Sequence, residues 1–282
     1  MVEQTLPEIL DRRAIGRPVA WVKPHAKDHF LADPFPCDYS GTLELLVEDY
    51  DQHNKGKLSR LSPPFGPDTL RLGAAIERNE HLSYPCVFVV DGRTYCVPEA
   101  YQSGKVPLYC REGEQWREVH TLFRGRKVVD PTLFQHGGRY WLFYTLQDDG
   151  AFGNLKLYAH YADDLFGDWQ PHALNPLKCD ITSSRPAGHV FDVDGVSYRP
   201  AQDCSATYGG ALVINRVLEL APTRFAEVPV ARLTPDPDGP YPDGLHTINA
   251  MGSARTVVDG KRFAFDPWAW RYNWKRRREL FM

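Results

Sequence analysis

The sequence predicts an all-β fold, and within that class a five-bladed β-propeller. Glycine and proline are frequent, at 22 and 23 of the 282 residues, and aromatic residues make up 12% of the chain. This composition favours many turns and short strands over a helical bundle. A hairpin motif also recurs along the chain, in its residues as well as in its hydropathy. A β-sandwich, which also contains hairpins with glycine turns, is the alternative architecture.

The hairpin motif is clearest in three segments, at residues 85–97, 131–143 and 186–198. Each has a short apolar strand, a tight turn that ends in glycine, and a second strand with an aromatic residue three positions beyond that glycine. Weaker copies flank them, at residues 33–48 and 246–265. The turn glycines are Gly41, Gly92, Gly138, Gly195 and Gly260. They lie 46 to 65 residues apart, about the length of a four-stranded propeller blade with its loops.

The five units use nearly the whole chain, so we expect a single domain over residues 1–282. The expected blades are centred near residues 33–48, 84–99, 130–145, 185–203 and 246–266, and a basic tail follows at 275–282.

Charge and short motifs exclude several classes of protein. A net charge of −3 argues against a nucleic-acid partner. The N-terminus lacks the basic start and apolar core of a signal peptide, and no apolar run is long enough to span a bilayer. The six cysteines form no CxxC pair, which predicts reduced thiols and a cytoplasmic location. No dinucleotide, P-loop or HExxH motif is present, so we expect neither a cofactor nor a metal.

In a propeller, the first strand of each blade lines the axial channel, and the residues at the strand starts point toward one mouth. We call the residues at these positions the first ring: Asp33, Tyr84, Asp130, Arg185 and His246. Two carboxylates that face one another across a channel can act as acid and base, or as acid and nucleophile. The alternative is that an Asp before a proline only starts a turn or a strand.

A second ring lies seven residues beyond each turn glycine, at Glu48, Glu99, Thr145, Gln202 and Pro267. Glu99 follows Cys-Val-Pro, and partial burial there would raise its pKa, as suits a general acid. The alternative is a solvated strand end.

The fourth unit is the richest in polar groups. Its Arg199, Gln202 and Asp203 are of the types that bind sugar hydroxyls or a phosphate. A structural salt bridge between blades is the competing interpretation.

These residues resemble the five-bladed propellers of invertases, levansucrases and arabinanases, which place three carboxylates around an axial pocket. Asp33-Pro34 and Asp130-Pro131 look like that group's Asn-Asp-Pro and Arg-Asp-Pro elements. The third element, Glu-Cys, has no clear equivalent, because Ser184-Arg185-Pro186 stands in its place. The resemblance therefore implies that Glu99 or Asp203 would have to act as the general acid.

A closer resemblance is to the propeller domain at the N-terminus of plant glucosamine inositolphosphorylceramide transferases and its bacterial relatives. It covers roughly residues 20 to 265, and the run at 198–204 (YRPAQDC) is its most specific part. The other matching motifs are 30–35 (FLADPF), 81–85 (HLSYP), 185–188 (RPAG), 208–210 (YGG) and 246–249 (HTIN). The resemblance implies a propeller that works on glycans. In the plant proteins a separate transferase domain follows.

The sequence-based hypothesis is an enzyme, namely a glycosyltransferase of glycan biosynthesis. It would move a sugar, a furanose being one candidate, from an activated, phosphate-bearing donor to a glycan or lipid-linked acceptor. Asp33 would be nucleophile or base, Asp130 would stabilise the oxocarbenium-like transition state, and Glu99 or Asp203 would be the acid. The expected substrate-binding residues are Tyr84, Arg185, Arg199, Gln202, His246 and Asn249. A glycoside hydrolase of arabinanase or fructosidase type and a non-catalytic glycan-binding module are the alternatives.

The C-terminal segment alternates aromatic residues over 266–274 and then turns basic at Lys275-Arg276-Arg277-Arg278. A final strand that closes the propeller, followed by a solvated tail, is one interpretation. The other is an interfacial patch that docks on an anionic membrane, where a lipid-linked acceptor would lie.

Overall fold

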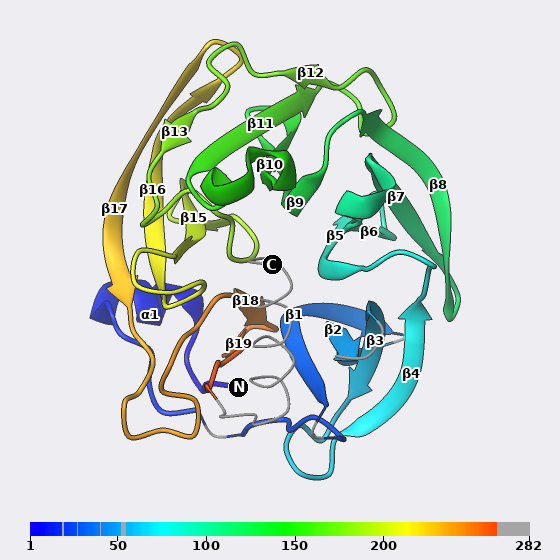
Figure 1. Cartoon of the computed structure of the whole chain (residues 1–282), viewed down its shortest axis with the longest axis vertical. Coiled ribbons are helices and arrows are strands. Elements are labelled where there is room, and N and C mark those ends of the chain that lie inside the picture. Colours follow the sequence, from blue (N-terminus) through cyan, green and yellow to red (C-terminus); the bar gives the residue numbers. More distant parts are fainter. Residues whose placement is uncertain (19, 27, 40, 52–54, 264–282) are drawn as a thin grey trace, which may run out of the picture.

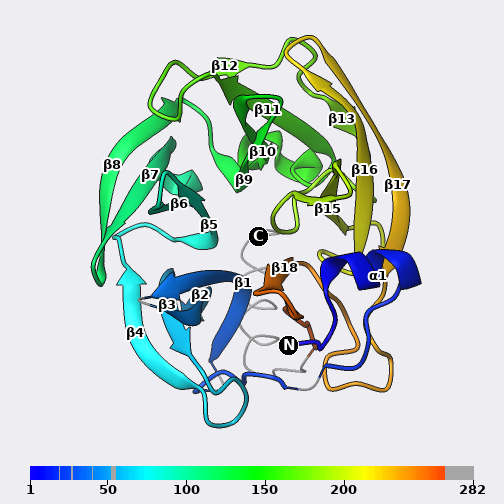
Figure 2. The same cartoon turned by 180° about the vertical axis from the view of Figure 1, so that it is seen from behind.

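The computed structural model describes residues 1–18, 20–26, 28–39, 41–51 and 55–263. The chain is all-β, and antiparallel sheets surround a central axis in the arrangement of a propeller (Figure 1). The view from behind shows the same ring of sheets (Figure 2). The predicted fold class is therefore confirmed.

Four sheets follow one another along the chain, and in the first three the first strand (β1, β5 and β9) lies nearest the axis. The first consists of β1 (His29–Tyr39), β2 (Thr42–Asp51), β3 (Gly56–Ser62) and β4 (Leu70–Ile76). The second consists of β5 (Ser83–Val90), β6 (Arg93–Glu99), β7 (Lys105–Glu112) and β8 (Gln115–Arg124). The third consists of β9 (Val128–His136), β10 (Arg139–Leu146), β11 (Lys156–Ala162) and β12 (Gln170–Pro171), and β13 (Lys178–Cys179) also pairs with β11. The fourth consists of β14 (Phe191–Val193), β15 (Val196–Asp203), β16 (Ala211–Ala221) and β17 (Arg224–Leu233).

The fifth unit is smaller than predicted. Within the described residues it is a two-stranded sheet of β18 (Ile248–Met251) and β19 (Arg255–Val258), with Val2 bridged to Thr256 at its edge. Five full blades are therefore not confirmed. The end of the predicted fifth blade and the basic tail at 275–282 lie outside the described residues.

Glycine turns join the inner strands of the second, third and fourth sheets as predicted. Both residues of the pairs Asp91-Gly92, Gly137-Gly138 and Asp194-Gly195 have positive φ, which tight hairpin turns of this kind require. The fifth unit differs, because its hairpin closes Met251 onto Arg255 and the turn glycine is Gly252, with φ 66°. Gly260, the predicted turn residue, lies beyond β19.

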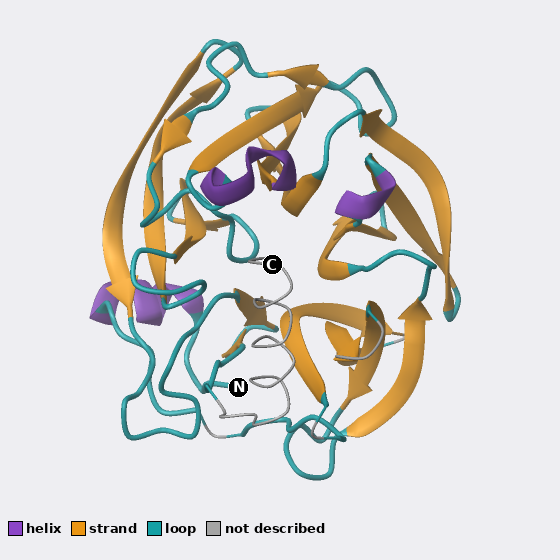
Figure 3. Cartoon of the chain, viewed as in Figure 1, coloured by secondary structure: helices purple, strands orange, loops and turns teal. Residues whose placement is uncertain are grey.

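Helices contribute little to the fold (Figure 3). The helix α1 (Leu6–Arg12) begins at a Thr5–Glu8 capping box and buries Leu6 and Ile9 in the core of the fourth and fifth sheets. Two 3₁₀ helices, Tyr101–Ser103 and Gln147–Phe152, follow the second strands of their sheets. In the described part of the chain no helix is long and apolar enough to cross a membrane.

Gly188 marks a close approach between the fourth and fifth sheets. Its φ is 122°, its N–H donates to the Tyr84 hydroxyl at 2.6 Å, and a Cβ there would lie 2.0 Å from the Ile248 carbonyl oxygen. Gly188→Ala is therefore expected to lower the free energy of unfolding by about 3 kcal/mol or more. Urea denaturation measures this. In the control Gly92→Ala nothing lies within 4 Å of the new Cβ, so only the backbone strain of about 1 kcal/mol is expected. Equal losses in both variants would contradict the crowding.

Candidate active site

The first ring begins at three equivalent irregularities in the inner strands. Asp33, Tyr84 and Asp130 have φ values of 50°, 44° and 49°, and each precedes a proline. The pairing register of each inner strand with its neighbour shifts at this point. A non-glycine residue with positive φ is strained by about 1–3 kcal/mol. The same strain at the same position of three sheets indicates a local geometry that the site requires.

Asp33 lies at the meeting point of the first, second and fifth sheets. Its carboxylate accepts hydrogen bonds from the Tyr84 N–H at 3.2 Å and from the Thr247 hydroxyl at 2.7 Å. Burial, together with the charges of Asp130 and Asp259, raises the pKa of Asp33 to about 6 against the opposing effect of His246. Near neutral pH, Asp33 is therefore a mostly ionised carboxylate that still binds protons readily.

His246 is held between two carboxylates. Its Nδ1 lies 2.6 Å from Asp259 Oδ2, and its Nε2 lies 3.7 Å from Asp33 Oδ1. The other oxygen of Asp259 accepts the backbone N–H groups of His246 and Thr247 at 3.0 and 2.9 Å. Burial disfavours the charged ring, but Asp259 and Asp33 outweigh it and raise the pKa of His246 to about 9. A cation therefore sits beside Asp33 at neutral pH.

Asp130 is held in place by side chains of the fourth unit. Arg185 binds it in a bidentate manner, with Nε 2.6 Å from Oδ2 and Nη2 3.2 Å from Oδ1, and Gln202 Nε2 donates to Oδ2 at 2.9 Å. Such charge-assisted pairs are the strong and geometrically specific ones. The guanidinium of Arg185 also lies 4.9 Å from the ring centroid of Tyr208, a side chain that is 43% exposed. The ion pair of Asp130 and Arg185 thus lies next to an accessible aromatic face.

Glu99 has a higher pKa than Asp33 and therefore the opposite protonation state near neutral pH. Burial and the neighbouring Asp130 charge raise its pKa to about 8, although Arg185 acts in the opposite direction. Its Oε2 accepts the backbone N–H of Asp130 at 3.0 Å. The pKa of Glu48 is also raised, by burial and then by the charges of Asp33, Glu99 and Asp130. The site therefore holds protonated carboxyls beside an ionised one, the arrangement that separates an acid from a base.

The second ring packs directly beside the first. Glu48, Glu99, Thr145 and Gln202 are all buried in the second strands of their sheets. Pro267, the predicted fifth member, lies outside the described residues. With Gly252 as the turn glycine, the position seven residues on is Asp259, and this is the residue that binds His246. Sequence reasoning missed Asp259 because it placed the fifth turn at Gly260.

Two predicted residues of the fourth unit point away from the site. Arg199 is 0% exposed and donates to Glu227 at 2.6 and 2.8 Å and to the carbonyls of Ser183 and Ser184, so its donors are used within the protein. Arg199 thus forms a salt bridge, but it links strands β15 and β17 of one sheet and not two blades, as the alternative interpretation had it. Asp203 pairs with Arg232 at 2.8 Å. Burial raises the pKa of Asp203, but the hydrogen bonds from Ser205 and the pairing with Arg232 together lower it, which disfavours a general acid.

Two further predicted residues, Asn249 and Tyr84, form hydrogen bonds that link the strands around the site. The Asn249 amide donates to the Pro34 carbonyl at 2.9 Å, and its oxygen accepts the His189 N–H at 2.8 Å. The Tyr84 hydroxyl lies 2.8 Å from Thr132 Oγ1. The structure thus brings together the predicted residues Asp33, Glu99, Asp130, Arg185, Gln202 and His246.

A second feature of the surface lies at the opposite ends of β1 and β2. It is a mostly apolar hollow whose lining includes Thr42, Pro64, Phe65 and Met251. None of its lining residues is a carboxylate, so we place the chemistry at the axial cluster instead.

Comparison with known proteins gives a family and a fold. The family described as "Glucosamine inositolphosphorylceramide transferase 1, N-terminal" matches residues 23–238. Glucosamine inositolphosphorylceramide transferase 1 of Oryza sativa subsp. indica is 31% identical over 211 residues, and that of Arabidopsis thaliana is 32% identical over 213 residues. Each match covers 72% of this chain but only 28% and 27% of the relative, so the chain spans little more than a quarter of those proteins.

Two solved structures with the same fold are glycoside hydrolases of low sequence identity. The catalytic domain of the Coprinopsis cinerea GH62 α-L-arabinofuranosidase superposes with a TM-score of 0.65 at 12% identity, covering 89% of this chain and 91% of that one. Zg3597, a family 117 glycoside hydrolase of Zobellia galactanivorans, gives 0.57 at 13% identity, covering 85% and 80%. At such identity the likeness concerns the fold alone. By its sequence match, the chain belongs to the family of the N-terminal domain of glucosamine inositolphosphorylceramide transferase 1.

Proposed function

We propose that this chain catalyses glycosyl transfer from an activated, phosphate-bearing sugar donor to a glycan or lipid-linked acceptor. The observation that carries the proposal is the opposed ionisation of Asp33 and Glu99 around one axial cluster that also contains His246 and Arg185. The name of the relatives supports transfer, and a furanose remains one candidate for the sugar.

Each side chain has a definite task in this proposal. Asp33 takes the proton of the acceptor hydroxyl as the new bond between that oxygen and the anomeric carbon forms. Glu99 gives its proton to the leaving phosphate oxygen as the old bond breaks. The Asp130 carboxylate stabilises positive charge on the sugar ring, and the protonated His246 favours an anionic donor.

Hydrolysis is the second candidate, because the structurally similar proteins are glycoside hydrolases and the same two carboxyls can activate water. A non-catalytic glycan-binding module is the third, since the match covers only 28% of the Oryza sativa relative. Action in the cytoplasm, at the inner face of a membrane, belongs to the same proposal. The aromatic and basic segment that would make membrane contact lies outside the described residues.

Turnover assays with nucleoside diphosphate sugars and with aryl furanosides test the proposal. Asp33→Asn is expected to reduce turnover about 1,000-fold and Glu99→Gln about 100-fold, within the range for lost acid–base groups. Asp203→Asn, a matched control whose carboxylate pairs with Arg232, is expected to retain most activity. Turnover of aryl furanosides alone would assign hydrolysis. Glycan binding without any turnover would support the third candidate, a non-catalytic glycan-binding module.

The pH profile gives an independent signature. Asp33 has to be ionised, so activity is lost as the pH falls below about 6. Glu99 has to be protonated, so activity is lost as the pH rises above about 8. The expected profile is a bell with its maximum near pH 7. A flat profile between pH 5 and 9 would contradict these roles.

A further inference from the structure

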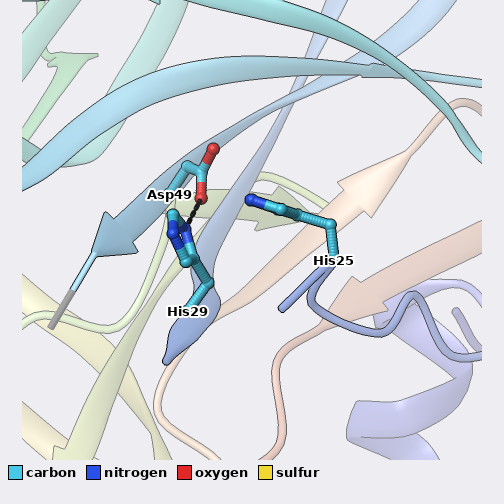
Figure 4. Close-up of side chains that lie close together, drawn as sticks. All are labelled: His25, His29 and Asp49. Carbon is cyan, nitrogen blue, oxygen red and sulfur yellow. Dashed lines mark hydrogen bonds and ion pairs between the residues drawn. The ribbon is translucent and has the colours of Figure 1, made fainter. Parts of the chain in front are cut away.

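A second cluster of polar side chains lies on the first sheet, away from the axial carboxyls. It consists of His25, in the segment before β1, His29, the first residue of β1, and Asp49 near the end of β2. One ligand atom from each lies within 4.8 Å of the other two. Figure 4 shows the His25 ring directed toward the contact between His29 and Asp49. We propose that these three residues bind a divalent transition metal ion, with Zn²⁺ as the best match, and leave one coordination position open.

The distances favour an ion over a simple hydrogen bond. His29 Nδ1 lies 3.4 Å from Asp49 Oδ1, which is longer than the usual 2.7–3.2 Å of an N–H···O bond. Zn²⁺ lies about 2.0–2.2 Å from imidazole nitrogen and carboxylate oxygen. Two such ligands at a tetrahedral angle are about 3.4 Å apart. The separation of His29 and Asp49 is therefore that of two ligands of one tetrahedral ion.

The surroundings also fit a metal site. The Ser59 hydroxyl donates to Asp49 Oδ2 at 3.1 Å, which fixes the carboxylate and presents Oδ1 to the two histidines. Such outer hydrogen bonds commonly orient metal ligands. The two histidine rings lie close together, with centroids 4.2 Å apart, and are tilted by 53°, so they are not stacked flat on one another.

The donor set points to zinc. His29 also lies within ligand distance of Asp28 and Asp51. Two imidazoles and one carboxylate suit Zn²⁺ better than Ca²⁺ or Mg²⁺, which prefer oxygen ligands. Three protein ligands leave a fourth position for water or for a ligand oxygen.

Zinc binding to the whole chain, stripped with EDTA and dialysed against Zn²⁺, tests this inference. We expect one equivalent of tightly bound zinc, and a tetrahedral Co²⁺ spectrum when cobalt replaces it. His25→Ala and His29→Ala should each weaken zinc binding at least 100-fold, and Ser59→Ala about 10-fold, as for other outer-shell partners. His25 is exposed, so its variant is not expected to disturb folding.

His246→Ala is the discriminating control, because Asp33, His246 and Asp259 form another group of possible ligands. If zinc binds at His25, His29 and Asp49, the His246→Ala variant keeps it. Zinc lost in His246→Ala but retained in His25→Ala would place the ion at the axis and overturn the proposal. Failure of the unsubstituted chain to bind Zn²⁺ at micromolar concentration would also overturn it. Neither readout depends on turnover, so this inference can fail while the proposed function stands.

Discussion

Glu99→Gln is expected to stabilise the fold at alkaline pH while it removes the proposed acid. In the folded chain the pKa of Glu99 is raised from 4.5 to about 8, chiefly by burial and then by Asp130. A raised pKa of an acid means that the folded state binds the proton more tightly than the unfolded state. Its contribution to stability is therefore complete below about pH 4.5 and is lost as the pH rises through 8.

The amide of glutamine has no proton to lose, so this loss is absent in the variant. At pH 9 the variant is expected to exceed the parent by a few kcal/mol in the free energy of unfolding, and the two should converge near pH 4.5. Urea denaturation as a function of pH measures the difference. Glu118→Gln is the control with the opposite sign, because ion pairs with Lys105 and Arg78 lower the pKa of Glu118 despite desolvation. A variant that is less stable than the parent at pH 9 would contradict the assignment of Glu99.

Glu227→Ala is expected to cost about 3–5 kcal/mol in the free energy of unfolding. The guanidinium of Arg199 is fully buried, and Glu227 binds it through both oxygens, so the substitution leaves an uncompensated charge in the interior. Lys178 loses its 2.9 Å contact with Glu227 as well. Urea denaturation measures the loss, and sugar or phosphate binding is expected to stay unchanged in the fraction that folds.

Two variants separate this explanation from others. The double substitution Arg199→Met with Glu227→Leu removes both charges and is expected to recover most of the lost stability. Asp163→Ala breaks the exposed pair with Arg139 and should cost less than about 1 kcal/mol. If Arg199→Met weakened ligand binding without loss of stability, Arg199 would be a binding residue after all.

The sequence predicted the ring of strand starts because Asp33 and Asp130 repeat one motif at matching places. The polar composition of the fourth unit did not show which of its residues belong to the site, because composition alone does not say on which face of the strand a side chain lies. Strand alternation does: Gln202 reaches Asp130, whereas Arg199 and Asp203, an odd number of residues away on β15, lie on the other face. Asp259 was not predicted for a different reason. Either Gly252 or Gly260 could form the fifth turn, and only the pairing of Met251 with Arg255 shows that the turn is at Gly252.

The histidine cluster was beyond sequence reasoning. His25 and His29 come from adjoining segments, but Asp49 reaches them only through the pairing of β1 with β2. The HExxH spacing, which is read along a helix, gives no information about ligands that meet across two strands.

The shared backbone at Asp33, Tyr84 and Asp130 has a consequence for how such a site can diversify. Two of these three strand starts present an aspartate and one a tyrosine on nearly the same φ, so the backbone accepts different side chains at an unchanged position. Each of these three sheets therefore accepts a different side chain at the same backbone position, and exchanging a single residue there would alter the chemistry of the axis without rebuilding a loop. The specificity of the axial site would then be set separately in each of these sheets, by the residue at its strand start.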